Sequence, residues 1–238
     1  SYDIYPFEIK NNYRELVLKL KELKIDLVIN ALHGGEGENG VIQSIFDKHN
    51  VKYTGSGPIA SKIAMDKNET KTICINNNIP TPDWIYLDLK SLKIDEIDLD
   101  LIIDKFNGSY VVKPSDEGSS LGLKIVKDNL SRDELRKAIE KVSLLSKEII
   151  VEQYIDGREL TVSLLGGKAL PIIEIIPKGF YYDFSSKYKK GQSEYIVPAI
   201  LSKNIDTMIR EYALKLYEKI GCRTYSRVDI ILGKNNIY

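Results

Sequence analysis

The chain has 238 residues, of which 43% are hydrophobic and 29% charged, so it is long enough to bury one large core or several small ones. Its 34 basic and 34 acidic residues cancel, which argues against a nucleic-acid-binding surface. No apolar run approaches the roughly 20 residues of a membrane span, and no signal peptide opens the chain. Cys74 and Cys222 lie far apart, and with two histidines in the chain we expect no zinc site. We therefore expect a cytoplasmic protein with reduced thiols that binds neither nucleic acid nor membrane.

The first part of the sequence predicts a small parallel α/β unit. Leucine spacing and two apolar runs predict helix, strand, helix and strand over 12–23, 26–31, 41–50 and 51–54. Between the first strand and the second helix, residues 32–40 contain four glycines. Glycines at the end of a buried strand are typical of a loop where the backbone approaches a ligand closely. The sequence TGSGP over 54–58 then predicts a turn and a domain boundary.

The rest of the sequence predicts two α+β units. The first begins with one helix over 59–76, which Pro80 and Pro82 cannot continue. Further helices are predicted within 88–107, over 131–145 behind a capping box, and over 202–220 with Gly221 as C-cap. Strands are predicted over 84–87, 110–113, 123–126, 148–153, 159–165, 169–177 and 224–232, with a polar, tyrosine-rich loop over 180–195.

A loop rich in glycine and serine follows the strand that ends at Lys113. Gly118, Ser119, Ser120 and Gly122 place backbone N–H groups in succession with little side-chain bulk. Successive backbone amides form a concavity that binds anions such as phosphate, and the ammonium of Lys113 lies at the same strand end. The alternative is a β-hairpin whose turn happens to contain small residues.

Two further groups of residues suggest a nucleotide site. Lys67 lies on a helix, and together with Lys113 it can neutralise phosphate charge; Glu152 and Glu159 flank a turn between two strands. Arg227 and Asp229 alternate on a late strand, so both side chains point to one face, where Asp can bind Mg²⁺ and Arg can stabilise developing negative charge. The alternative readings are two surface glutamates and one exposed ion pair, worth under ~1 kcal/mol.

In order along the chain, LHGGEGENG, TGSG, MDKNETK, IPTP, VVKPSDEGSSLG, VEQYIDGRELTVSLL, YDFSSKY, YIVPA and SRVDIIL resemble the D-alanine–D-alanine ligase family of ATP-grasp enzymes. The resemblance covers nearly the whole chain. It implies an ATP-grasp fold of mixed α/β and α+β class, preceded by a small parallel α/β domain. The expected division is a partial N-terminal substrate-binding domain over 1–58, a central ATP-grasp subdomain over 59–150 and a C-terminal ATP-grasp subdomain over 151–238.

The resemblance also implies a reaction for peptidoglycan precursor synthesis. ATP phosphorylates one D-alanine, and the amine of a second D-alanine attacks the acylphosphate to give the dipeptide. It implies Mg²⁺ or Mn²⁺ at Asp229, oxyanion stabilisation by Arg227, and His33 near the second substrate and the phosphate. For ATP it implies phosphate contacts from Lys67, Lys113 and Lys187, a closing loop of Gly118, Ser119, Ser120 and Gly122, an adenine pocket of Glu152, Gln153 and Ile155, and ribose contacts from Glu159.

Tyr188 bears on the second substrate. The family resemblance implies that Tyr188 closes the active-site loop by hydrogen bonding with Ser119, and that relatives joining D-alanine to D-lactate carry a histidine there instead. Tyr188 therefore argues for an amine as the second substrate. Another carboxylate–amine ligase of this superfamily, such as a D-alanine–D-serine or D-alanine–D-lactate type, and a non-catalytic nucleotide-binding module remain alternatives.

The resemblance further implies a homodimer. It also places the glutamate that holds the first D-alanine before Ser1, and the remaining magnesium ligands after Tyr238. On this reading the 238-residue piece alone is expected to have little or no ligase activity.

Overall fold

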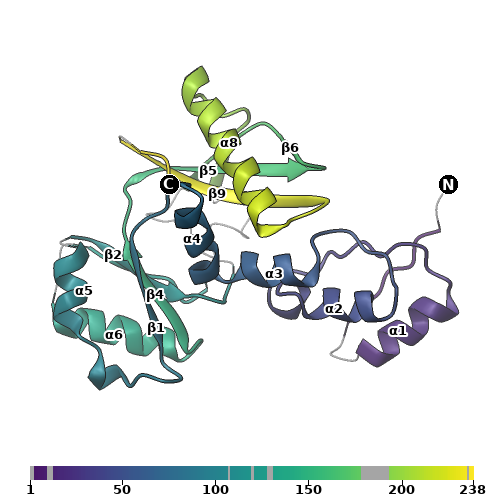
Figure 1. Ribbon diagram of the computed structural model, residues 1–238, viewed down its shortest axis with the longest axis horizontal. Helices are drawn as coiled ribbons and strands as arrows, with labels where there is room; N and C mark the ends of the chain where they lie inside the picture. The colour runs from purple at the N-terminus through teal and green to yellow at the C-terminus, as the bar shows by residue number, and fades with distance from the viewer. Residues whose placement is uncertain are drawn as a thin grey trace.

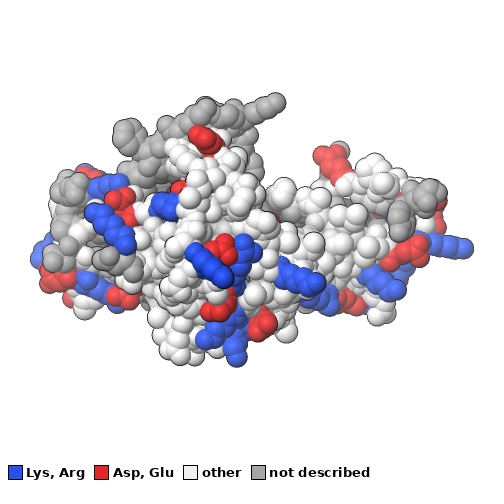
Figure 2. All heavy atoms as spheres, turned by 90° about the horizontal axis from the view of Figure 1, so that it is seen from above, with Lys and Arg blue, Asp and Glu red and all other residues white. Residues whose placement is uncertain are grey.

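The computed structural model describes residues 3–9, 13–106, 108–118, 121–127, 131–177, 193–234 and 236–238. Figure 1 shows an elongated molecule, with the helices of the N-terminal unit at one end and two β-sheets at the other. In the described part of the chain, no helix is long and apolar enough to cross a membrane. On the face seen in Figure 2, basic and acidic side chains are interspersed rather than gathered by sign.

The N-terminal unit packs two helices against an irregular backbone. The elements are α1 (Tyr13–Glu22), the 3-10 turn η1 (Gly35–Gly37) and α2 (Val41–Lys48). Leu20, Ile42 and Phe46 form the centre of their shared core. The helices therefore agree with the periodicity of their apolar residues.

The prediction of a parallel sheet for this unit is wrong, because the described part of the structure contains far less strand pairing than expected. The sheet is reduced to a single parallel bridge between Val28 and Tyr53. The run 26–31 was expected to be buried on both faces, but Ile29 is 76% exposed. An apolar run is buried as a central strand only when other segments of the protein cover both of its faces. The described residues supply only one segment beside this run.

The single helix predicted over 59–76 is two helices, α3 (Pro58–Met65) and α4 (Lys67–Asn76). Asp66 lies between them in an extended conformation, and its carboxylate accepts the N–H groups of Asn68 and Glu69 at the start of α4. Aspartate competes with the helix in this way because its short side chain bonds nearby backbone donors. Lys67 is thereby the first residue of α4, and both helices pack against α8 (Lys203–Ile220).

The first sheet has the strand order β1-β4-β2-β3, with each neighbouring pair antiparallel. Helices α5 and α6 cover it, and the buried residues between sheet and helices include Tyr110, Leu135 and Ile149. The predicted strands, the helix within 88–107 and the serine cap of α6 are confirmed. The bounds are β1 Trp84–Asp88, η2 Ile94–Glu96, α5 Leu99–Phe106, β2 Tyr110–Pro114, β3 Lys124–Val126, α6 Arg132–Ser143 and β4 Glu148–Gln153.

The second sheet has the order β6-β5-β7-β8, and β9 pairs with β5 along its whole length. Helix α8 covers it, begins after the cap residue Ser202 and ends at Ile220 with Gly221 as its C-cap, as predicted. The predicted strand over 169–177 is interrupted, because Pro171 cannot donate a ladder hydrogen bond. The bounds are β5 Gly157–Leu165, β6 Lys168–Ala169, β7 Ile173–Pro177, β8 Ser193–Ile196 and β9 Tyr225–Gly233, so 193–195 is strand rather than loop.

The N-terminal unit contacts the second sheet where β9 begins. The Tyr225 hydroxyl donates to the carbonyl oxygen of Asn30 at 3.2 Å, and the Arg223 guanidinium donates to that of Gly55 at 3.3 Å. The Arg223 guanidinium also stacks over the Tyr53 ring at 5.3 Å. These contacts join the two units, and the predicted division at residues 58 and 150 stays a prediction.

Candidate functional site

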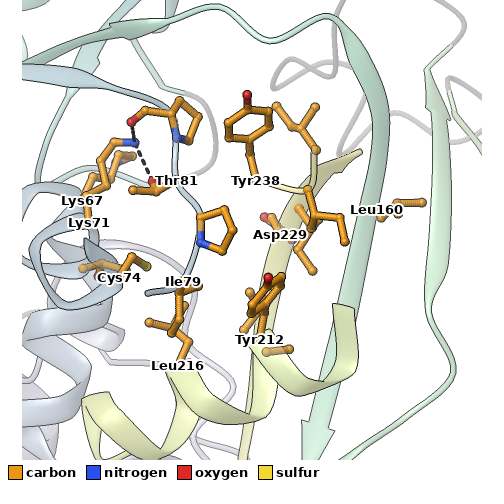
Figure 3. Close-up of a pocket in the computed structure, with 18 of the residues that line it drawn as sticks. Lys67, Lys71, Cys74, Ile79, Thr81, Leu160, Tyr212, Leu216, Asp229 and Tyr238 are labelled. Atoms are coloured by element: carbon orange, nitrogen blue, oxygen red, sulfur yellow. Dashed lines mark hydrogen bonds between the residues drawn. The ribbon is translucent and has the colours of Figure 1, made fainter. Parts of the chain in front are cut away.

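A cavity of about 380 Å³ lies between the two sheets. Helix α4 and the loop 79–82 form one wall, and β9 and α8 form the opposite wall, as Figure 3 shows for Lys71 and Asp229. Apolar side chains cover much of the lining, including Ile79, Leu160 and Leu216. A concave, largely apolar site with a few placed charges is the usual form of a small-molecule pocket.

Lys67 supplies one of the positive charges of the α4 wall. Its ammonium donates to the carbonyl oxygens of Ser115, at 3.2 Å, and of Glu117. Burial lowers the pKa of this ammonium most, and the nearby charge of Lys113 lowers it further. Acidic neighbours oppose the shift in part, and the resulting pKa is about 8. Within the described residues Lys67 makes no ion pair, so its charge is available to an anion entering the cavity.

The start of α4 is fixed to the end of β2. The Ser115 hydroxyl donates to the Asp66 carboxylate at 2.8 Å and accepts the backbone N–H of Asn68 at 3.1 Å. The backbone N–H of Lys67 donates to the carbonyl oxygen of Ser115 at 2.9 Å. Because Lys113 lies two residues before Ser115, these bonds set the positions of Lys67 and Lys113 relative to each other.

Two lysines share one buried carboxylate where α4 meets the first sheet. Lys113 forms an ion pair with Glu152, and the ammonium of Lys71 lies 3.1 Å from the other oxygen of that carboxylate. Glu152 is 9% exposed. Burial raises the pKa of its carboxyl, but the charges of Lys113 and Lys71 together lower it further, so the pKa is below its usual value. Glu152 is therefore ionised at neutral pH.

Asp229 lines the opposite wall. Arg227 pairs with it on the same face of β9, as the alternation predicts, but is absent from the cavity lining. The Arg227 Nε atom lies 3.0 Å from Oδ1 of Asp229, and the Thr161 hydroxyl donates to the same oxygen at 2.8 Å. Both charged side chains are 59% exposed, so solvent or a ligand can reach them. In the described residues no three acidic, histidine or cysteine side chains form a metal cage. One carboxylate supplemented by phosphate oxygens suits Mg²⁺, so Asp229 fits this ion.

The remaining predicted residues divide into three groups. Glu159 lines the cavity, whereas Gln153 and Ile155 do not, and the Gln153 N–H donates to the carbonyl oxygen of Asp83 at 2.9 Å. Gly118 lies near Met65, and Gly122 has a φ of +74° in a turn where a Cβ atom would lie 2.5 Å from Leu145 Cδ1. Ser119, Ser120, Lys187 and Tyr188 lie outside the described residues.

The structure does not bring His33 to the cavity. The residue is absent from the cavity lining, its side chain is 81% exposed, and its Nδ1 atom lies 3.7 Å from the Glu38 carboxylate. Glu38 also accepts the backbone N–H of Gly34, so it holds the glycine loop that carries His33. The role of His33 near a second substrate stays a prediction.

Lys71 is the site residue that our sequence reasoning missed. It lies one helical turn after Lys67, so the two lysines share one face of α4. That spacing was the available signal, but a helical lysine is usually solvated, and only the fold shows that Lys71 is 6% exposed. Pro82 was read as a helix breaker and Thr81 only as part of the IPTP motif, yet both accept hydrogen bonds from Lys71.

The comparisons with known proteins agree on one family. A family model described as the D-Ala–D-Ala ligase C-terminus matches residues 73–238. The D-alanine–D-alanine ligase of Carboxydothermus hydrogenoformans is 37% identical over all of this chain and 76% of that protein. The ligase of Syntrophotalea carbinolica is 36% identical over 94% of this chain and 70% of that protein.

The fold leads to the same family. The crystal structure of a D-alanine–D-alanine ligase from Bacillus anthracis matches with a TM-score of 0.84 and 34% identity, covering 100% of this chain and 74% of that one. The structure of the Bacillus anthracis ligase complexed with ATP matches with a TM-score of 0.79 and 33% identity, over 96% and 70% of the two chains.

Proposed function

We propose that this chain, which belongs to the D-alanine–D-alanine ligase family, catalyses the ATP-dependent joining of two D-alanines. The observation that carries the proposal is the separation of charge across the cavity between the sheets. Where α4 meets the first sheet, Lys67, Lys71 and Lys113 lie with the single carboxylate of Glu152, so this side carries an excess of positive charge for phosphate oxygens. The other lining acids, Glu159 and Asp229, lie on the second sheet. The names of the relatives give no support to the alternatives, a different acid–amine ligase or a non-catalytic nucleotide-binding module.

On this proposal the cavity binds ATP between its two walls. Lys67 and Lys113 contact the phosphates, and the apolar part of the lining surrounds the base. Glu152 lies beside the base and Glu159 beside the ribose, where ionised carboxylates can accept hydrogen bonds from amine and hydroxyl groups. We propose the glycine and serine loop as the cover over the phosphates, and closure would exclude water from the reaction.

The reaction begins with phosphoryl transfer. A carboxylate oxygen of the first D-alanine attacks the γ-phosphorus, and the bond between that phosphorus and the oxygen of ADP breaks. Phosphoryl transfer depends mainly on positioning and charge neutralisation, which Lys67 and Lys113 provide. The resulting acylphosphate makes the carboxyl carbon electrophilic, because phosphate is a good leaving group.

The second step forms the peptide bond. The neutral amine of the second D-alanine attacks the carboxyl carbon and then loses a proton, and the bond from that carbon to the phosphate oxygen breaks. Negative charge collects on the carbonyl oxygen in between, and on this proposal the Arg227 guanidinium, which is paired with Asp229, stabilises it. Asp229 would hold Mg²⁺, which supplies further positive charge to the phosphate oxygens when it is bound.

Three further features belong to the same proposal. The protein acts in the cytoplasm, where ATP is available. It functions as a homodimer, and Lys187 and Tyr188 complete the site over the phosphates.

Phosphate release from the full-length protein with ATP and D-alanine tests the proposal. We expect release that requires D-alanine, and a fall in kcat/KM of about 100-fold or more in Lys113→Met. Lys137→Met is the matched control, because Lys137 is 71% exposed on α6 and lies away from the cavity. Phosphate release independent of D-alanine, or an unaffected Lys113→Met variant, would contradict the proposal.

A further inference from the structure

Lys71 is a buried cation with three acceptors around its ammonium. It donates to the Thr81 hydroxyl and to the Pro82 carbonyl oxygen, each at 2.8 Å, and forms its ion pair with Glu152 at 3.1 Å. Figure 3 shows it reaching from α4 to the loop that carries Thr81. The ammonium also lies 5.1 Å from the centroid of the Trp84 ring. These contacts fix Lys71 in one position.

Lys113 is less constrained than Lys71. Its side chain is 19% exposed, against 8% for Lys71, and Glu152 is its only ion-pair partner among the described residues. In the proposed function Lys113 turns to the phosphates of ATP. Lys71 then becomes the one lysine that still neutralises Glu152, because its bonds to Thr81 and Pro82 hold it beside the carboxylate.

We propose that Lys71 is a positioning residue that keeps Glu152 ionised and aimed into the cavity when nucleotide is bound, and that it thereby sets a preference for a base with an exocyclic amine. This inference rests on the proposed function, because it requires a nucleotide in the cavity. Lys71 touches no substrate in this account and acts through Glu152.

The preference follows from hydrogen-bond chemistry. An ionised carboxylate only accepts hydrogen bonds, so it pairs with the amine of adenine and repels the carbonyl oxygen that hypoxanthine carries in the same place. A protonated Glu152 would donate to that carbonyl oxygen instead. Without Lys71, and with Lys113 on the phosphates, the buried carboxylate would lose its neutralising partner and take up a proton.

Calorimetric titration of the full-length protein with ATP and with inosine triphosphate tests this inference. We expect the wild-type protein to bind ATP more tightly, and the ratio of the two affinities to fall about tenfold or more in Lys71→Met. Lys71→Arg should restore most of the ratio, because it keeps the charge. Lys90→Met is the matched control. Lys90 forms an ion pair with Glu148, which lies on the same strand as Glu152, but the Lys90 side chain is 62% exposed.

The outcomes separate the two proposals. If the wild-type protein binds no ATP, the proposed function fails. If it binds ATP but Lys71→Met keeps the wild-type ratio, or if the wild-type protein binds both nucleotides equally, the inference about Lys71 is overturned. A fall in both affinities by the same factor would also overturn it, because a purely structural role for Lys71 predicts that result.

Discussion

The Arg227 guanidinium and the Asp229 carboxylate form an ion pair on β9, with Nε and Oδ1 3.0 Å apart. Asp229 lines the cavity wall opposite Lys67 and Lys71. The two side chains of the ion pair are 59% exposed, so the pair itself contributes little to stability. The pair leaves the Asp229 carboxylate in the cavity lining with the Arg227 guanidinium beside it.

Asp229→Asn should impair magnesium use with little effect on stability. The amide keeps the shape of the side chain but removes the charge that would hold the ion, so the Mg²⁺ concentration for half-maximal activity should rise about tenfold or more. The melting temperature should change little, because exposed pairs contribute at most about 1 kcal/mol. Asp100→Asn is the control, since it alters an exposed Asp–Arg pair away from the cavity. An unchanged Mg²⁺ dependence in Asp229→Asn would contradict the assignment.

ATP binding near pH 8 should take up protons at Lys67. The pKa of this ammonium is lowered to about 8, so about half of the unliganded protein lacks the charge at that pH. A bound phosphate favours the charged form and raises the pKa, so binding draws in a proton. Calorimetry at pH 8 in two buffers of different ionisation enthalpy measures this uptake. Lys67→Arg should remove it, and a wild-type protein without uptake would contradict the assigned position of the phosphates.

Glu152→Gln should destabilise the protein at neutral pH. Loss of the carboxylate leaves Lys71 buried without its counter-ion, which typically costs about 3–5 kcal/mol in the free energy of unfolding. Urea unfolding at pH 7 measures the change. Glu148→Gln is the control. Glu148 lies on the same strand as Glu152, and its substitution breaks a partly exposed ion pair with Lys90. Equal effects of the two substitutions would contradict the importance of the buried lysine–glutamate cluster.

The same carboxylate gives a pH dependence. The folded pKa of Glu152 is lowered, so its contribution to stability is present above the unfolded pKa of about 4.3. That contribution is lost as the pH falls through the lower, folded pKa. The stability difference between wild type and Glu152→Gln should therefore shrink as urea unfolding is repeated at increasingly acidic pH. A difference that stays constant would show that the charge of Glu152 is not what stabilises the fold.

Asp66→Ala should weaken both the helix start and ATP binding. Loss of the α4 cap costs about 0.5–2 kcal/mol, and the bond from Ser115 to Asp66 is lost with it. Because Lys67 is the first residue of α4, its ammonium should become less well placed and the KM for ATP should rise. Ser131→Ala removes the corresponding cap of α6 and serves as the control for stability alone. A similar KM in both variants would contradict a role for Asp66 in placing Lys67.

Local sequence signals predicted most of the fold. Serine and glycine caps fixed the bounds of α6 and α8, and alternation placed Arg227 and Asp229 on one face of β9. The break at Asp66 was missed because the predicted single helix took no account of the Asp66 side chain, which caps the start of α4. The predicted sheet around Val28 failed because burial of a strand depends on its neighbours, which local sequence does not specify.

Part of the candidate site could also be predicted from local sequence signals. Strand ends and alternation identified Lys113, Glu152 and Asp229, since each position follows from local pattern. Lys71 was missed because its importance depends on burial against Glu152, a residue 81 positions later in the chain. His33 was assigned through family resemblance alone, and the structure leaves it exposed beside Glu38.

The position of the triphosphate is the central claim of this account. A crystal structure of the full-length protein with a non-hydrolysable ATP analogue and Mg²⁺ tests it most directly. We expect the phosphates between Lys113 and Asp229, with the Lys113 ammonium turned from Glu152 toward a phosphate oxygen and Lys71 still paired with Glu152. A triphosphate bound outside the cavity between the two sheets would contradict the account.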